Sequence, residues 1–184
     1  MIISMLSYLY FYNKIWYKEE LRKTLWNISL DRMWKPKISP KMNIEIRKAT
    51  KADIKDIKII LSFYYLDTEK VEKNLPEFIV AVLDNKTVGC ACLDIDEVVE
   101  LRSIAVLPGL RNKGIGSRLA DAVVSRSAGL SDAVYLRTTS PGFFEKKGFQ
   151  RLPNEEKKVI WNECRQCDKY DICRQTLMKR VTTF

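Results

Sequence analysis

The residues best suited to chemistry lie in a short glycine-rich stretch, LPGLRNKGIGSRLA, at positions 107–120. Arg111, Gly114 and Gly116 form an R-x-x-G-x-G pattern between an apolar run and a pattern of helical spacing. The first amides of a helix lack partners within the helix, and the helix dipole favours negative charge there. Glycine lets the backbone approach a phosphate because no Cβ intervenes. The pattern therefore predicts a pyrophosphate-type anion site, with Lys113 as a second cation.

Two other phosphate-binding motifs are excluded at this position. A P-loop needs Lys and then Ser or Thr after its second glycine, where this chain has Ile115 and Gly116. A dinucleotide fingerprint, G-x-G-x-x-G, needs a third glycine where Leu119 stands. The remaining alternative to an anion site is a tight turn from strand to helix that holds no ligand.

The composition narrows the chemistry further. The 184 residues include no histidine, which excludes Ser-His-Asp and Cys-His nucleophile systems and histidine-ligated metals. A general base must then be Glu, Asp, Tyr, Cys, Lys or water. The odd number of cysteines, five, does not suit a fully paired secreted scaffold. No apolar run reaches the roughly 20 residues that span a membrane, and the first residues lack a signal-peptide pattern. We therefore expect a cytoplasmic protein with no membrane partner.

The elements that must position the glycine turn can be read along positions 42–184. The capping pair Thr50 and Asp53 indicates a helix start, and the apolar positions that follow recur at helical spacing. The pattern predicts strands at 43–49, 77–84, 86–96, 97–106, 132–139 and 176–181, and helices at 50–65, around 69–73, from 115 onward and at 140–149. This order predicts an α+β (mixed α/β) domain.

Residues 1–41 have a different composition. They hold three of the four tryptophans, no glycine, and eight basic against three acidic residues, or +5 of the formal net charge of +9. The last part of this extension, KPKISPK at 35–41, is typical of an extended linker, because each proline disfavours helix in the residue before it. Two interpretations are open: Met42 is the true first residue, or the extension is a helical arm that docks on the domain or a partner.

Two stretches carry a resemblance to a known family. ELRSIAVLPGLRNKGIGSRLA, at 100–120, resembles the central motif of the GNAT superfamily of N-acetyltransferases, and SPGFFEKKGF, at 140–149, resembles its next motif. The resemblance covers about 140 residues and implies a central, mixed but mostly antiparallel sheet flanked by helices, with acetyl-CoA as co-substrate. Within the superfamily, the chain is most similar to the short amino-acid N-acetyltransferases, including acetylglutamate synthases.

The resemblance also implies roles at the cofactor site. The backbone of Ile104, Ala105 and Val106 would pair with the pantetheine arm, and an amide near Val106 would polarise the thioester carbonyl. The amides of the turn and the first helical residues would hold the pyrophosphate. This set comprises Arg111, Asn112, Lys113, Gly114, Ile115, Gly116 and Ser117. Phe144, from the aromatic pair of the second motif, completes the expected cofactor site.

The expected chemistry requires a neutral amine to attack a thioester. Glu100 lies on the strand before the cofactor motif, where many relatives carry a glutamate base that acts through water; the alternative is a surface pair of Glu100 and Arg102. Arg102 and Arg137 are the expected partners of a substrate carboxylate. Many superfamily members protonate the leaving thiolate with a tyrosine, but this chain has Phe143 and Phe144 there.

The missing tyrosine leaves the general acid open. Tyr135, Tyr65 or solvent are the alternatives, and Tyr135 is the expected catalytic partner of Glu100. A thiol has a pKa of about 8.5, so a thiolate needs little help from an enzymic acid.

The C-terminal segment at 161–175 carries Cys164, Cys167 and Cys173 in a C-x2-C-x5-C pattern. The spacing of the first two is typical of zinc knuckles, but only three ligands are visible. Asp168, Asp171, Cys90, Cys92 or a second subunit could supply the fourth. A disulfide and reduced thiols are the other two interpretations.

Three functional hypotheses follow. The first is transfer of an acetyl group from acetyl-CoA to the α-amine of an amino acid such as glutamate, by direct attack in a ternary complex. The second is acetylation of a protein N-terminus or lysine. The third, with least support, is a nucleic-acid-binding module that combines the basic extension with the cysteine segment. The expected partner is a small-molecule amine acceptor, and the pattern is compatible with a homodimer.

Overall fold

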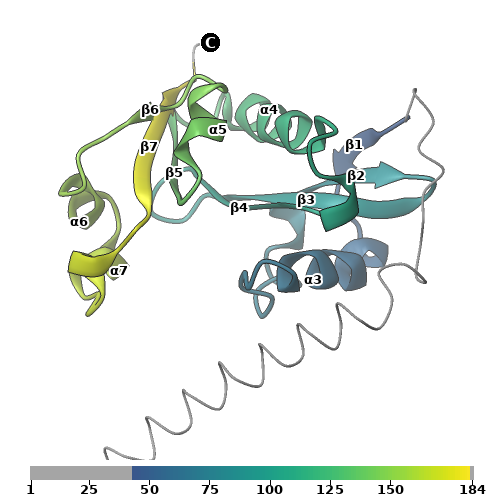
Figure 1. Cartoon of the computed structure of the whole chain (residues 1–184), viewed down its shortest axis with the longest axis horizontal. Coiled ribbons are helices and arrows are strands. Elements are labelled where there is room, and N and C mark those ends of the chain that lie inside the picture. The colour runs from purple at the N-terminus through teal and green to yellow at the C-terminus, as the bar shows by residue number, and fades with distance from the viewer. Residues whose placement is uncertain (1–42, 183–184) are drawn as a thin grey trace, which may run out of the picture. The chain divides into compact units, whose positions relative to one another are not determined.

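The computed structural model describes residues 43–182; the predictions for the extension at 1–41 lie outside this range. Within residues 43–182, one mixed sheet of seven strands runs in the order β1-β2-β3-β4-β5-β7-β6 (Figure 1). All neighbouring strands are antiparallel except β4 and β5. The predicted α+β class and the mostly antiparallel sheet are confirmed.

The bounds of the elements follow the predicted order closely. The strands are β1 (Glu45–Lys48), β2 (Phe78–Leu83), β3 (Lys86–Asp94), β4 (Glu100–Val106), β5 (Ala133–Thr138), β6 (Gln150–Arg151) and β7 (Thr176–Val181). The α-helices of the described range are α3 (Ile54–Ser62), α4 (Ile115–Ser127), α5 (Pro141–Glu145), α6 (Glu156–Ile160) and α7 (Asn162–Arg165). No described helix is long and apolar enough to cross a membrane.

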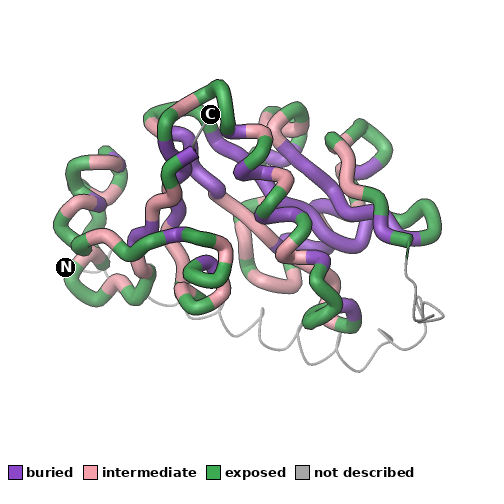
Figure 2. Tube along the Cα trace, turned by 90° about the horizontal axis from the view of Figure 1, so that it is seen from above, coloured by how far each residue is buried: buried purple, intermediate pink, exposed green. Residues whose placement is uncertain are grey.

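Helices α3 and α4 cover opposite faces of the sheet (Figure 1). Ile57, Ile60 and Leu61 from α3 are buried against the apolar residues of β2 and β3, as their helical spacing predicts. Ile115, Leu119 and Val123 are buried on α4. The central strands are accordingly the most deeply buried part of residues 43–182 (Figure 2).

The start of α3 is held to the sheet by Asp53. Its carboxylate accepts the backbone N–H of Thr50 at 2.7 Å, the Thr87 hydroxyl at 2.6 Å and two guanidinium N–H groups of Arg47. Burial alone would raise the pKa of Asp53, but these hydrogen bonds outweigh it and hold the pKa well below its usual range. The predicted helix start is therefore confirmed, and it is tied to β1 and β3.

Strands β4 and β5 pair only where they begin. Their one residue pair is Glu100 with Tyr135, supported by a bond from the Tyr135 N–H to the Val99 carbonyl at 2.9 Å. Beyond this point the strands separate, while β4 stays paired with β3 along its length and β5 with β7. The rest of β4 therefore has an unpaired edge in the middle of the sheet.

Two local expectations need correction. The helix expected around 69–73 is a series of turns, followed by a 3-10 turn at Leu75–Glu77. The Asn74 N–H bonds to the Lys70 carbonyl at 2.9 Å, but Pro76 has no N–H to donate to the Glu72 carbonyl, so a longer helix cannot form there. The segment between β6 and β7 also contains two short helices, α6 and α7, that the apolar periodicity did not predict.

Candidate functional site

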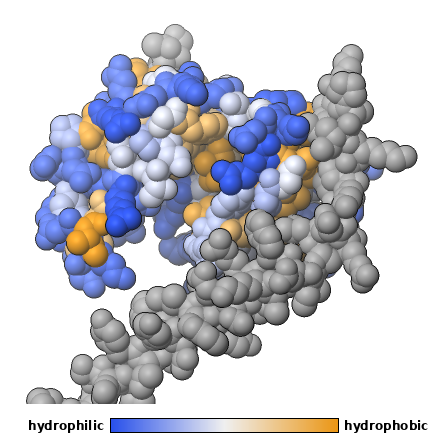
Figure 3. All heavy atoms as spheres, viewed as in Figure 1, coloured by the Kyte–Doolittle hydropathy of each residue, from blue (hydrophilic) through white to orange (hydrophobic). Residues whose placement is uncertain are grey.

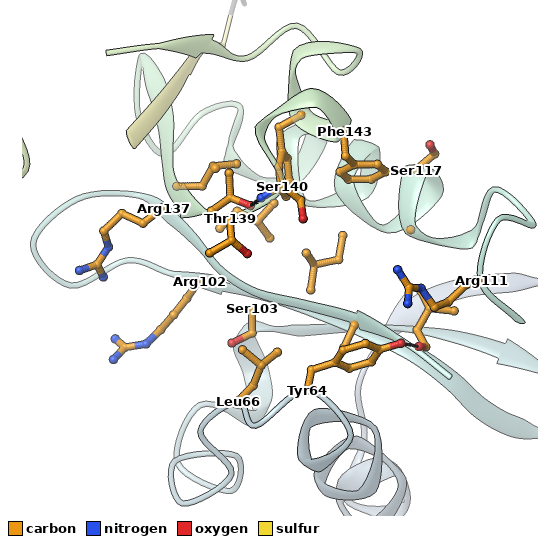
Figure 4. A pocket seen from close by; sticks show the side chains of 18 of the residues that line it. Tyr64, Leu66, Arg102, Ser103, Arg111, Ser117, Arg137, Thr139, Ser140 and Phe143 are labelled. Carbon is orange, nitrogen blue, oxygen red and sulfur yellow. Dashed lines mark hydrogen bonds between the residues drawn. The ribbon is translucent and has the colours of Figure 1, made fainter. Parts of the chain in front are cut away.

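The separation of β4 and β5 opens a cavity of about 870 Å³, within the range of small-molecule sites (Figure 4). Its walls come from β4, the turn before α4, β5 and the start of α5. Two residues just after α3, Tyr64 and Leu66, and one residue before β7, Gln175, complete the lining.

Backbone groups form one end of this cavity. Asn112 and Gly114 have φ angles of +61° and +79°, and Gly114 is the N-cap of α4. This left-handed geometry turns successive amides toward the same side, as in anion-binding nests. A Cβ built on Gly114 would meet no described atom within 4 Å, so there is open space beside the turn. No ion pair within residues 43–182 involves Arg111 or Lys113, so both cations remain available to an anion.

Most of the expected cofactor residues lie together at this cavity. Nine of the eleven line it: Ile104, Ala105, Val106, Arg111, Asn112, Gly114, Gly116, Ser117 and Phe144. The side chain of Ile115 instead packs in the core at 1% exposure, and Lys113 lies outside the lining. Ile115 can contribute only its backbone amide, in keeping with the expectation for this position.

The unpaired edge of β4 forms the floor of the cavity. Residues 101–106 of β4 all line it, so their free backbone groups can accept an extended ligand as a further strand would. Tyr64 supports the far end of this edge, because its hydroxyl donates to the Val106 carbonyl at 2.6 Å. Burial raises the pKa of Tyr64, and the nearby Arg111 offsets this only in part.

Charged side chains form the other end of the cavity. Figure 4 shows the guanidinium groups of Arg102 and Arg137 together, away from Arg111. Arg102 pairs with Asp94 at 2.5 Å between Nη1 and Oδ2. Arg137 pairs with Glu100 at 3.1 Å and with Glu163 at 2.6 Å. The predicted pair of arginines is therefore present, but carboxylates of the chain already contact both.

Glu100 lies behind Arg137 and is not part of the cavity wall. Its side chain is buried, with Oε1 accepting from Nε and Nη2 of Arg137 and Oε2 accepting from the Trp161 indole N–H at 3.0 Å. Burial raises the pKa of Glu100, and Arg137 and Trp161 offset part of this rise. The alternative of an exposed pair of Glu100 with Arg102 is wrong, because the pairing partner is Arg137.

The two tyrosines expected near the reaction do not line the cavity. Tyr135 packs edge-on against Trp161, with ring centroids 6.4 Å apart, and Tyr65 is 54% exposed. The tyrosine on the cavity wall is Tyr64, which no motif of the sequence indicated. Phe143 and Phe144 do lie at the cavity, where they contact each other with centroids 4.9 Å apart.

The segment at 161–175 contributes to the site through Trp161. This side chain is 4% exposed and stacks against the Arg137 guanidinium at 4.3 Å. The next residue, Asn162, donates its backbone N–H and side-chain amide to Glu97 at 3.0 and 2.8 Å. These contacts fix α7 beside β4 and β5. The apolar pattern of the sequence did not indicate them, because they join residues that are far apart along the chain, 65 positions for Asn162 and Glu97.

The cysteines are free thiols in the structure, which corrects the disulfide interpretation. Within residues 43–182, no group of three or more Cys, Asp or Glu residues is arranged to hold a metal ion. Cys164 accepts a weak contact from Arg137 at 3.5 Å, and Cys173 lies 3.7 Å from the Lys157 ammonium. The structure thus provides no ligand set for the zinc site considered at Cys164, Cys167 and Cys173.

Comparisons with known proteins agree with this geometry. A family model described as an acetyltransferase (GNAT) domain matches residues 74–151. An uncharacterized N-acetyltransferase of Chlorobaculum tepidum is 33% identical over 119 residues, covering 61% of this chain and 76% of that protein.

Longer proteins share only part of their length with this chain. An amino-acid acetyltransferase of an Enterobacter species is 32% identical over 104 residues, which are 51% of this chain and 23% of that protein. The structure of N-acetylglutamate synthase from Neisseria gonorrhoeae, complexed with coenzyme A and N-acetyl-glutamate, is similar with a TM-score of 0.64 and 23% identity. The match covers 78% of this chain and 36% of that one, and it shows a shared fold.

Proposed function

Because the chain belongs to the GNAT family of acetyltransferases and is an acetyl-CoA-dependent N-acetyltransferase, we propose that its acceptor is the α-amine of a small amino acid such as glutamate. The observation that carries this proposal is the pair of arginines, Arg102 and Arg137, at the end of the cavity opposite the glycine turn. Guanidinium groups bind carboxylates through strong, oriented hydrogen bonds.

We propose the glycine-turn end of the cavity for the cofactor. The turn amides would hold the pyrophosphate, with Arg111 and Lys113 as cations, and the unpaired edge of β4 would bind the pantetheine arm. A thioester placed along this edge points toward Arg102 and Arg137. Attack there joins the acceptor nitrogen to the acetyl carbon and expels the CoA thiolate, which solvent can protonate.

The lining of the cavity favours an α-amine over a lysine side chain. It contains no Asp or Glu from residues 43–182, so the acceptor must lose its proton mainly to solvent. The α-amine at a chain terminus has a pKa of about 8. In a free amino acid the neighbouring carboxylate stabilises the ammonium and raises this pKa, but it stays below that of a lysine side chain, so the α-amine keeps the larger neutral fraction. A lysine ammonium, with a pKa of about 10.4, is less than roughly a thousandth neutral at about pH 7.

In this scheme Glu100 is a positioning residue. Glu100 accepts hydrogen bonds from Nε and Nη2 along one edge of the Arg137 guanidinium, while Trp161 covers the face of the same group. Tyr135 packs against Trp161 and supports the same arrangement. The earlier expectation, that Glu100 acts as the base through water, remains the competing proposal.

A thiol-release assay tests the acceptor. With acetyl-CoA, we expect a free amino acid to exceed its own α-carboxamide by about 10–100-fold in kcat/KM, the value of hydrogen bonds to a charged group. Nα-acetyl-lysine, which offers only an ε-amine, should react far more slowly. Equal rates for the acid and its amide, or faster reaction of short peptides, would overturn the amino-acid proposal in favour of a protein acceptor.

A further inference from the structure

We propose that Glu163 is a specificity-determining residue: its carboxylate holds the Arg137 N–H that the acceptor's carboxylate needs and is displaced when the acceptor binds. This inference rests on the proposed function, because it concerns the carboxylate of the same acceptor. Glu163 lies on α7, between Trp161 and Cys164, and no motif of the sequence pointed to it.

The donors of Arg137 are divided between two carboxylates. Nε and Nη2 donate to Glu100 at 3.1–3.3 Å, while Nη1 lies 2.6 Å from Oε1 of Glu163. The Glu100 side of the guanidinium is enclosed by the sheet and by Trp161. An incoming carboxylate must therefore compete for the Nη1 side.

The two carboxylates differ in how firmly they are held. The Glu100 side chain is 7% exposed and accepts a further hydrogen bond from Trp161. The Glu163 side chain is 58% exposed, and Figure 3 shows mainly hydrophilic side chains over α6 and α7 on the visible face. Glu163 can rotate into water at little cost, whereas Glu100 cannot leave its pocket. Glu163 is thus the carboxylate that an acceptor can replace.

Charge balance gives the same assignment. At this end of the cavity Arg102 and Arg137 face three carboxylates, those of Asp94, Glu100 and Glu163. With Glu163 in place the group carries a net negative charge, which repels an acidic acceptor. When Glu163 turns away, the acceptor carboxylate occupies its position beside Arg137, and one negative charge replaces the other there. Glu163 therefore sets the affinity for carboxylates without touching the reacting atoms.

Glutarate tests this inference, since it offers carboxylates but no amine to acetylate. We expect calorimetry on the full chain to show about fivefold tighter glutarate binding to Glu163→Gln than to the unmodified protein, the upper range for a partly exposed ion pair. The gain should shrink at high salt, because exposed charges are screened. Glu155→Gln is the matched control. It removes an exposed carboxylate that also lies between β6 and β7, makes the same change in net charge, and should leave the affinity for glutarate unchanged.

The outcomes separate this inference from the proposal beneath it. If glutarate binds the unmodified protein, and Glu163→Gln binds it equally or more weakly, then Glu163 serves to orient Arg137 and the displacement is wrong. If glutarate binds none of the three proteins, the carboxylate-bearing acceptor itself is wrong. A gain shared equally by Glu155→Gln would assign the effect to overall charge and overturn the role of Glu163.

Discussion

At one end of the cavity, the turn before α4 and the first residues of α4 present backbone amides, and the two cations there, Arg111 and Lys113, form no ion pair within the described range. At the other end, the charged groups are side chains, and both arginines are paired with carboxylates. The first arrangement suits a constant ligand, such as the pyrophosphate of a cofactor. The second arrangement can change which acceptor it binds when a single side chain is replaced, and this suits an acceptor site in a family with varied acceptors.

The two ends also differ in what a substitution can disturb. Backbone donors survive most side-chain changes, so only the glycines that shape the turn are sensitive positions. Side-chain donors are coupled to each other, and removing one changes the charge and orientation of its neighbours. Three substitutions probe this contrast.

The largest effect is expected at the cofactor end, from Gly114→Val. With φ at +79°, a branched side chain strains the turn by roughly 1–2 kcal/mol and places methyl groups in the open space beside the amides. Losing charge-assisted hydrogen bonds to the pyrophosphate should raise the Kd for acetyl-CoA by about 100-fold. Titration calorimetry measures the Kd, and CoA serves as the ligand because it carries the same pyrophosphate as acetyl-CoA.

Gly129→Val provides the matched control. Gly129 has a similar φ of +86°, an added Cβ would also meet nothing within 4 Å, and the residue is absent from the cavity wall. Both variants should lose similar stability in thermal unfolding, while only Gly114→Val loses CoA affinity. Equal CoA affinity in the two folded variants would show that the turn holds no phosphate.

A smaller effect is expected at the acceptor end, from Glu100→Gln. Replacing a charged with a neutral hydrogen-bond acceptor on Arg137 should lower kcat/KM by about tenfold, chiefly through KM. The pH profile should keep its shape and follow the acceptor amine. A catalytic base would contribute about 10²–10⁴-fold. Because burial raises the pKa of Glu100, a base there would also add an acid limb that the Gln variant loses. Loss of that acid limb in the Gln variant would show that Glu100 acts as the general base.

The same contrast explains what the sequence could predict. The glycine turn, the strand before it and the helix after it are neighbours in the chain, so their spacing indicated an anion site, and Arg111, Gly114 and Gly116 of that pattern lie on the cavity wall. The other expected cofactor residues came from the family resemblance. The separation of β4 from β5 could not be derived from spacing, because the pairing of strands depends on residues far apart in the chain. The helix expected at 69–73 is wrong: these residues form turns, and Pro76 lacks the N–H that would continue a helix through them.

The acceptor end was less predictable for a physical reason. The two arginines were expected to bind a substrate carboxylate, but the carboxylates of the chain that pair with them, those of Asp94, Glu100 and Glu163, were not. Trp161 reaches Glu100 across 61 positions, and Glu163 reaches Arg137 from a four-residue helix with no apolar periodicity. Glu100 was expected at the reaction because many relatives carry a glutamate base on the strand before the cofactor motif. Its burial and its engagement with Arg137 depend on a segment that the pattern left unassigned.

The smallest effect is expected from Arg102→Met, which keeps the aliphatic length and removes the charge. Arg102 is 32% exposed and already paired with Asp94, so its hydrogen bond to an acceptor competes with water and with that carboxylate. We expect KM for a carboxylate-bearing amino acid to rise by about three- to fivefold, with kcat and CoA affinity unchanged. Arg118→Met, on the exposed side of α4 and outside the cavity wall, should leave KM and kcat unchanged.

Asp94→Asn should lower KM for the same amino acid, because it releases Arg102 and removes a negative charge from the acceptor end. If Arg102→Met lowers kcat as strongly as it raises KM, Arg102 contacts the reacting group and the acceptor lies deeper along β4 than proposed. If Asp94→Asn also raises KM, the pair acts as a structural unit, and Arg137 alone distinguishes the acceptor end from the cofactor end.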